Sequence, residues 1–357
     1  MERARQVLTE HISTGTTPGA VAVVVRGGDT VATLMEGRHT YDTDARPVAM
    51  SDRYDLASLT KPVTATACML LEEQSMLSTT DLVSAWVPAF VGGGREAVQV
   101  QHLLAHCSGL PAHLPLYEWC SGSGEFAEAI CDISLETPPG EVTRYSDLGF
   151  ILLGAVLEAA SGSTLESLLT ERVLNPMGMH RTGFCPSTGL LGEIPPTEVG
   201  ELGLIHGAVH DENAQAMGGV ASHAGLFGPA TDLARLLTAY QNGGRLDGAQ
   251  VLPEEGARRY VTRAGIVDGS TRGLGWDTVS EEGSSAGRHF STRSFGHLGF
   301  TGTSMWADPE TGLGVVLLTN RVHPTRKNNA IRELRPAFHD AVSEALGIGA
   351  RAEPSGR

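Results

Sequence analysis

The stretch Ser58-Leu59-Thr60-Lys61 places a serine and a lysine three residues apart, and the interpretation of this sequence starts from it. Lys61 is one of only two lysines in a chain of 357 residues that also contains 24 arginines. Arginine stays protonated at ordinary pH, whereas a lysine amine removed from water can lose its proton and act as a base. A serine one helical turn from such an amine has the arrangement of an activated nucleophile. The alternative is a chance spacing.

The residues after Ser58 predict a helix that holds both side chains in its first turn. Residues 59–74 have helical apolar spacing, and Pro62 is tolerated only near a helix start. The positive end of the helix dipole then favours an oxyanion at Ser58, and Lys61 lies on the same face. The alternative is that Ser58 only caps the helix.

A second candidate segment is Tyr145-Ser146-Asp147, directly before a helix predicted from Leu148. A tyrosine at a loop–helix junction can present its hydroxyl as an acid or a base. The alternative is that Ser146 or Asp147 caps the helix and Tyr145 packs against it. For Asp147 taken alone, capping is the favoured role.

A third candidate segment covers residues 295–304, where Gly296, Gly299 and Gly302 interrupt a strand pattern. Glycines in a strand are typical of places where the backbone closely approaches a ligand. A free N–H group there could complete an oxyanion hole. The alternative is a bulged edge strand.

In this order, the three segments resemble the penicillin-recognising serine hydrolases, a superfamily that includes class C β-lactamases, DD-peptidases and family VIII carboxylesterases. Residues 102–111, 139–140 and 219–227 are similar to it as well, and the resemblance runs from about Gly19 to Leu346. The resemblance implies that Ser58 is acylated and that Lys61 and Tyr145 share the proton transfers. It also implies that the N–H groups of Ser58 and Phe300 hold the oxyanion.

The chain departs from the family at two places. Asp147 stands where the family usually has asparagine. A carboxylate near Lys61 would favour the ammonium form of Lys61, so Tyr145 would act as the general base. The triplet His297-Leu298-Gly299 replaces lysine-threonine-glycine, which helps hold the substrate carboxylate in lactamases and DD-peptidases. A histidine is mostly neutral at pH 7, and each lost charge-assisted hydrogen bond costs about 1.5–3 kcal/mol. A neutral ester or amide is therefore the favoured substrate.

The order of the predicted elements indicates a mixed α/β (α+β) fold. Strand patterns occur near both ends and helical patterns in the middle, and a final helix around residues 328–346 should kink or begin later at Pro336. We expect one antiparallel sheet built from both termini and flanked by helices, with a mainly helical region inserted, as in class C β-lactamases. The expected domains are residues 1–75 with 228–357, and residues 76–227.

Composition limits the partners and the compartment. The net charge of −15 disfavours nucleic acids and anionic membranes, and no secretory signal or apolar run of about 18 residues is visible. Five irregularly spaced cysteines predict neither disulfides nor a zinc site, so a cytoplasmic protein without cofactor or metal is expected. His206, His210, Asp211, Glu212 and His223 could suggest a metal, but loop packing or lining of a pocket is favoured.

The sequence therefore predicts a serine hydrolase that acts through an acyl-enzyme on a small ester or amide, most simply as a carboxylesterase. A DD-peptidase, a D-amino-acid amidase or a β-lactamase is the alternative among enzymes. A non-catalytic ligand-binding or sensor domain is the alternative from another class. The sequence does not indicate the oligomeric state.

Overall fold

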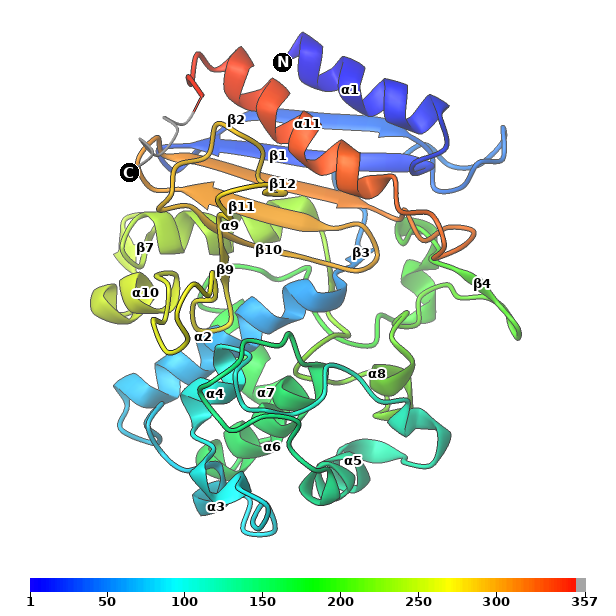
Figure 1. Ribbon diagram of the computed structural model, residues 1–357. Coiled ribbons are helices and arrows are strands. Elements are labelled where there is room, and N and C mark those ends of the chain that lie inside the picture. Colours follow the sequence, from blue (N-terminus) through cyan, green and yellow to red (C-terminus); the bar gives the residue numbers. More distant parts are fainter. Residues whose placement is uncertain (351–357) are drawn as a thin grey trace.

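A six-stranded antiparallel sheet, to which both ends of the chain contribute, forms the upper layer of the molecule in Figure 1; the computed structural model describes residues 1–350. The strand order is β2-β1-β12-β11-β10-β9, and β1 lies antiparallel to β12 with Val23 opposite Val316. The strands are β1 (Gly19–Arg26), β2 (Asp29–Gly37), β9 (Asp277–Thr278), β10 (Phe295–Leu298), β11 (Ser304–Asp308) and β12 (Leu313–Thr319). The predicted sheet from both termini is confirmed.

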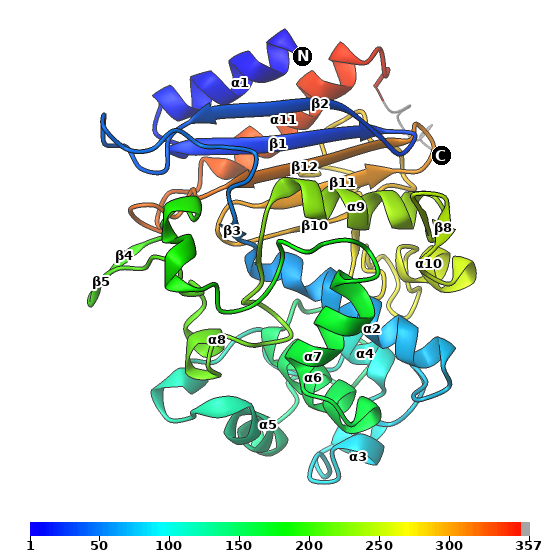
Figure 2. The same ribbon diagram turned by 180° about the vertical axis from the view of Figure 1, so that it is seen from behind.

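Both faces of the sheet are covered, which explains the unbroken apolar run of β1. Ala20, Ala22 and Val24 belong to a core beneath α1 (Glu2–Ser13) and α11 (Ile331–Ala345). The alternate residues, such as Val23, belong to the main core on the other face, where α9 (Ala230–Gln241) packs (Figure 2). Successive side chains of a strand point to opposite faces, so a strand buried on both sides shows no polar alternation.

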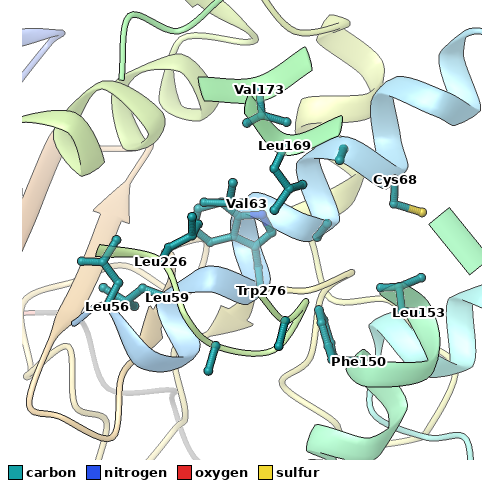
Figure 3. Packing of buried hydrophobic residues seen from close by; sticks show 14 of the residues in the cluster. Leu56, Leu59, Val63, Cys68, Phe150, Leu153, Leu169, Val173, Leu226 and Trp276 are labelled. Carbon is teal, nitrogen blue, oxygen red and sulfur yellow. The ribbon is translucent and has the colours of Figure 1, made fainter. Parts of the chain in front are cut away.

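The helical region surrounds α2 (Thr60–Glu73), whose residues are nearly all buried. Figure 3 shows Val63 of this helix in one packed cluster with Leu153, Leu169 and Trp276. Trp276, Cys68 and Cys107 are buried. The other helices are α3 (Val83–Trp86), α4 (Val100–Leu104), α5 (Gly122–Asp132), α6 (Asp147–Ser161), α7 (Leu165–Leu169), α8 (Glu212–Ala216) and α10 (Glu254–Tyr260).

Residues 1–350 also contain short two-stranded ribbons. They pair β3 (Tyr54–Asp55) with β6 (Phe227–Gly228), β4 (Val199–Gly200) with β5 (Gly203–Leu204), and β7 (Arg245–Leu246) with β8 (Ala249–Gln250). The first ribbon matters for the site, because it holds residues 54–55, directly before Ser58, against residues 227–228.

Two helices depart from simple α-helical geometry or from their predicted bounds. After α7 (Leu165–Leu169) the chain continues in a π-helical turn, Thr170–Leu174. The last helix begins at Ile331 and continues through Pro336 instead of starting there. An internal proline costs a helix one hydrogen bond, and burial of Leu334, Phe338 and Val342 in the core beside the sheet offsets that loss.

Within residues 1–350, no single helix has both the length and the apolar character needed to cross a membrane. The bent pair Asp147–Ser161 and Leu165–Leu174, whose axes differ by 79°, meets those criteria only when taken together. The division into residues 1–75 with 228–357 and residues 76–227 stays a prediction.

Candidate active site

Ser58 lies in a strained turn directly before α2. It is the middle residue of a 3₁₀ turn, Ala57–Leu59, and Ala57 has a φ of 47°, which non-glycine residues seldom adopt. The turn is held by Asp55, whose buried carboxylate accepts hydrogen bonds from the N–H groups of Ala57 (2.8 Å) and His210 (2.7 Å). The N-cap position of α2 falls on Leu59, so the alternative that Ser58 caps this helix is wrong.

Lys61 is fully buried, and its ammonium group makes three hydrogen bonds. Nζ donates to Oγ of Ser58 at 3.0 Å, to Oδ1 of Asp147 at 2.7 Å and to the carbonyl oxygen of His223 at 3.2 Å. Burial would lower the pKa of Lys61, but Asp147 and Tyr145 more than offset it and the pKa is raised. Lys61 is therefore an ammonium ion in the free protein, as expected beside a carboxylate at position 147.

Tyr145 and Asp147 reach the site because Ser146 takes the capping role in α6. Oγ of Ser146 accepts from the N–H of Gly149, which leaves the Asp147 carboxylate free to pair with Lys61. Capping, the favoured role of Asp147 taken alone, is therefore wrong. The centroid of the Tyr145 ring lies 4.8 Å from Nζ of Lys61. Burial raises the pKa of Tyr145, and the charge of Lys61 offsets only part of that rise.

The turn after β10 is fastened to the residues that precede Ser58. Oγ1 of Thr301 donates to the carbonyl of Asp55 (2.8 Å) and Oγ1 of Thr303 donates to that of Leu56 (3.1 Å). Within residues 1–350 the N–H of Phe300 has no hydrogen-bond acceptor, and Phe300 lines the same cleft as Ser58. In the described chain β9 pairs only with Phe295 and Gly296 of β10, and β10 pairs with β11 without a bulge, so β10 is an edge strand only at His297 and Leu298, beside the cleft.

The cleft has a volume of about 610 Å³, and the predicted residues Ser58, Tyr145, Asp147, His297, Leu298, Gly299 and Phe300 line it together. Nδ1 of His297 lies 2.9 Å from the carbonyl oxygen of Leu298, so this nitrogen carries the proton. Burial, and then the charge of Lys61, lowers the pKa of His297 well below its usual value. The triplet at 297–299 thus contributes no positive charge to the cleft.

Sequence reasoning missed the arginines on the cleft wall. Arg321, Arg326 and Arg332 come from the segment after β12 and from the first turn of α11. Arg326 is neutralised by Glu198 and Glu212, whereas Arg332 is exposed and has no ion-pair partner in the described chain. No local motif marks these residues among 24 arginines, so only the fold identifies them.

The histidines at 206–223 have protein partners. His206 contacts the carbonyl oxygens of Leu191 and Ile194, His210 pairs with Glu198, and His223 pairs with Asp211. His210, Asp211 and Glu212 also line the cleft, which confirms the predicted pocket-lining role of this loop. Over residues 1–350 no three His, Cys, Asp or Glu side chains are placed to hold a metal ion.

Comparisons with known proteins identify the family of the chain. The family model described as Beta-lactamase matches residues 4–337. A protein of Escherichia coli (strain K12), named as a candidate D-alanyl-D-alanine carboxypeptidase, is 31% identical over 306 residues, covering 76% of this chain and 69% of its own. An N-acetylmuramyl-L-alanine amidase of Bacillus subtilis (strain 168) is 30% identical over 364 residues, covering 90% of this chain and 81% of its own.

Two solved structures share the fold. EstCE1, a hydrolase with promiscuous acyltransferase activity, superposes with a TM-score of 0.77 at 22% identity, covering 96% of this chain and 97% of its own. A class C β-lactamase of Rhodobacter sphaeroides superposes with a TM-score of 0.76 at 18% identity, covering 97% of this chain and all of its own. The predicted α/β fold of the class C β-lactamase type is thereby confirmed, and the chain belongs to the beta-lactamase family.

Proposed function

We propose that this protein is a serine hydrolase that cleaves a small ester or amide through an acyl-enzyme on Ser58. The observation that carries the proposal is the 3.0 Å hydrogen bond from Lys61 to Oγ of Ser58 beside Tyr145 in one cleft. Burying a charged group destabilises a fold, because the charge is removed from water. A buried ammonium beside a serine at a strained turn therefore indicates a functional site.

The steps follow from the charges of the site. The Tyr145 phenolate, which the Lys61 ammonium stabilises, takes the proton of Ser58 Oγ as this oxygen attacks the substrate carbonyl carbon. Burial raises the pKa of Tyr145, so the phenolate is the minor form of the free site at neutral pH. The N–H groups of Ser58 and Phe300 hold the oxyanion of the tetrahedral intermediate. Tyr145 then protonates the leaving alcohol or amine, and a water molecule releases the acyl group by the reverse proton path. Asp147 keeps Lys61 charged throughout.

Carboxylesterase-type activity is our first proposal for the bond that is cleaved. Neutral His297 and the apolar Leu298 offer no cation to a substrate carboxylate at the triplet. A small neutral ester has no carboxylate, so it needs no cation at this position. The net charge of −15 further supports small-molecule substrates over nucleic acids.

One observation favours a second candidate, an amidase or carboxypeptidase that acts on a substrate with a carboxylate. Arg332 lines the cleft and has no carboxylate partner within residues 1–350, so it could pair with a substrate anion there. The names of the two relatives at 30–31% identity, a carboxypeptidase and an amidase, support amide cleavage as well.

The test combines labelling with a substrate panel. A fluorophosphonate should label Ser58, identified by peptide mass spectrometry, and Ser58→Ala should abolish the label. The panel is short-chain nitrophenyl esters, D-alanyl-D-alanine peptides, N-acetylmuramyl-L-alanine and nitrocefin, and the highest kcat/KM identifies the class. Absence of labelling and of turnover on the whole panel would contradict the proposal and favour a ligand-binding domain.

A further inference from the structure

One peptide group joins a buried arginine to the proposed oxyanion hole. The carbonyl oxygen of Gly299 and the N–H of Phe300 belong to the same peptide unit. That carbonyl accepts a hydrogen bond from Nη2 of Arg335 at 2.7 Å and another from the N–H of Gly302 at 3.1 Å. The same Nη2 donates to the carbonyl oxygen of Thr303 at 2.8 Å. Arg335 thus holds both ends of the turn that presents the Phe300 N–H.

An arginine is unusual as the donor to these two backbone carbonyls. Its side chain is buried, it forms no ion pair in the described part of the chain, and its Nε has no hydrogen-bond partner there. Burial, and then the nearby charge of Arg321, lowers the pKa of Arg335 to about 9, so the guanidinium is still charged at neutral pH. A buried cation without a counter-ion destabilises a fold, and a neutral amide donor could close the same turn without that cost.

We propose that Arg335 is a positioning residue that strengthens the oxyanion hole by polarising the Gly299–Phe300 peptide. A charged donor on the carbonyl oxygen draws electron density away from the amide nitrogen, so the N–H becomes a better donor to an oxyanion. The effect is larger in a site of low dielectric constant. This inference rests on the proposed acyl-enzyme at Ser58.

Arg321 provides a matched comparison on the same turn. Its Nε donates to the carbonyl oxygen of Phe300 at 2.8 Å, which belongs to the next peptide unit, whose N–H is that of Thr301. Arg321 and Arg335 therefore anchor one loop with similar bonds. Only Arg335 bonds to the peptide that would hold the oxyanion.

The experiment measures the hydrogen bond at the acyl carbonyl directly. Wild type, Arg335→Gln, Arg335→Lys and Arg321→Gln enzymes are acylated with a slowly released ester carrying a ¹³C carbonyl, and isotope-edited infrared spectra give its stretching frequency. A weaker oxyanion hole raises this frequency. We expect the frequency to increase in the order wild type, Arg335→Lys, Arg335→Gln, and to shift less in Arg321→Gln than in Arg335→Gln. We also expect kcat to fall about tenfold in Arg335→Gln at little changed KM, less than for loss of a whole donor.

The outcomes separate this inference from the proposed function. A wild-type enzyme that cannot be acylated overturns both. An acylated wild type with an unchanged frequency in Arg335→Gln, or with equal shifts in Arg335→Gln and Arg321→Gln, overturns only the role of Arg335. If Arg335→Gln does not fold, Arg335→Lys decides, because a shorter single-point donor should still raise the frequency above wild type.

Discussion

Nζ of Lys61 lies 2.7 Å from Oδ1 of Asp147, in an ion pair whose lysine is wholly removed from solvent. The pair joins α2 to the first residue of α6 and so connects the two segments that carry the nucleophile and the tyrosine. Because burial alone would lower the pKa of Lys61, the charge of this lysine depends on Asp147.

Replacing Asp147 by asparagine should therefore change the pH dependence of the enzyme. Without the carboxylate, burial dominates and the pKa of Lys61 falls, so the ammonium loses its proton at lower pH. If the ammonium form is the active one, the alkaline limb of kcat/KM moves to lower pH in Asp147→Asn. Profiles of both enzymes on the same nitrophenyl ester check this. An alkaline limb at the wild-type position would show that Asp147 does not control the charge that matters.

Replacing Lys61 by arginine tests whether this site needs an ammonium group of this shape. Guanidinium keeps the charge but not the three-point contact of Nζ with Ser58, Asp147 and His223. We expect turnover to fall by at least about 100-fold. The larger side chain should also cost about 1–3 kcal/mol of unfolding free energy, measured by thermal denaturation.

The other lysine provides the control for that experiment. Lys327 is exposed and does not line the cleft, so Lys327→Arg should keep wild-type kcat/KM and thermal stability. Near-normal turnover in Lys61→Arg would contradict the proposed proton path.

The sequence predicted the sheet and most helices because side chains that are buried at regular intervals produce a regular pattern of apolar residues. The strand patterns near both ends correspond to β1 and β12, which lie side by side and are buried. The site residues Ser58, Lys61 and Tyr145 were proposed because the three segments together resemble one family. Each segment taken alone left a structural alternative open.

What the sequence did not reveal depends on contacts between distant segments. The left-handed conformation of Ala57 requires the Asp55 carboxylate, which is fixed in turn by the N–H of His210. The positive charge at the cleft wall comes from arginines such as Arg332 and not from the 297–299 triplet, and Arg332 is brought there by α11, which packs beside the sheet.

Arg332→Gln should distinguish a carboxylate-bearing substrate from a neutral one. An exposed ion pair is worth about 1 kcal/mol or less, so KM for a D-alanyl-D-alanine peptide should rise up to about fivefold. KM for a neutral nitrophenyl ester should stay unchanged. Wild-type KM for the peptide should also rise with added salt, and this salt dependence should weaken in the variant. Equal effects on both substrates would mean that Arg332 shapes the cleft instead of pairing with an anion.

Gly299 should tolerate no side chain, because the turn that presents the Phe300 N–H closes over it. A Cβ atom there would lie 2.0 Å from Oγ1 of Thr303 and 2.7 Å from the carbonyl oxygen of Leu56. To avoid these contacts, the turn must shift. The shift would break the hydrogen bond from Oγ1 of Thr303 to the carbonyl of Leu56 and move the N–H of Phe300. We expect Gly299→Ala to lower kcat about 100-fold, comparable to loss of an oxyanion donor, and to destabilise the fold by about 1–3 kcal/mol.

Gly124 in α5 is the matched control for Gly299, since a Cβ there meets no atom within 4 Å and its φ is not positive. Gly124→Ala should leave kcat/KM unchanged and raise the unfolding free energy by about 0.4–1 kcal/mol, because alanine loses less backbone entropy in a helix. Turnover and thermal unfolding of the two variants are measured side by side. Loss of stability without loss of kcat in Gly299→Ala would mean that the turn supports the fold but does not hold an oxyanion.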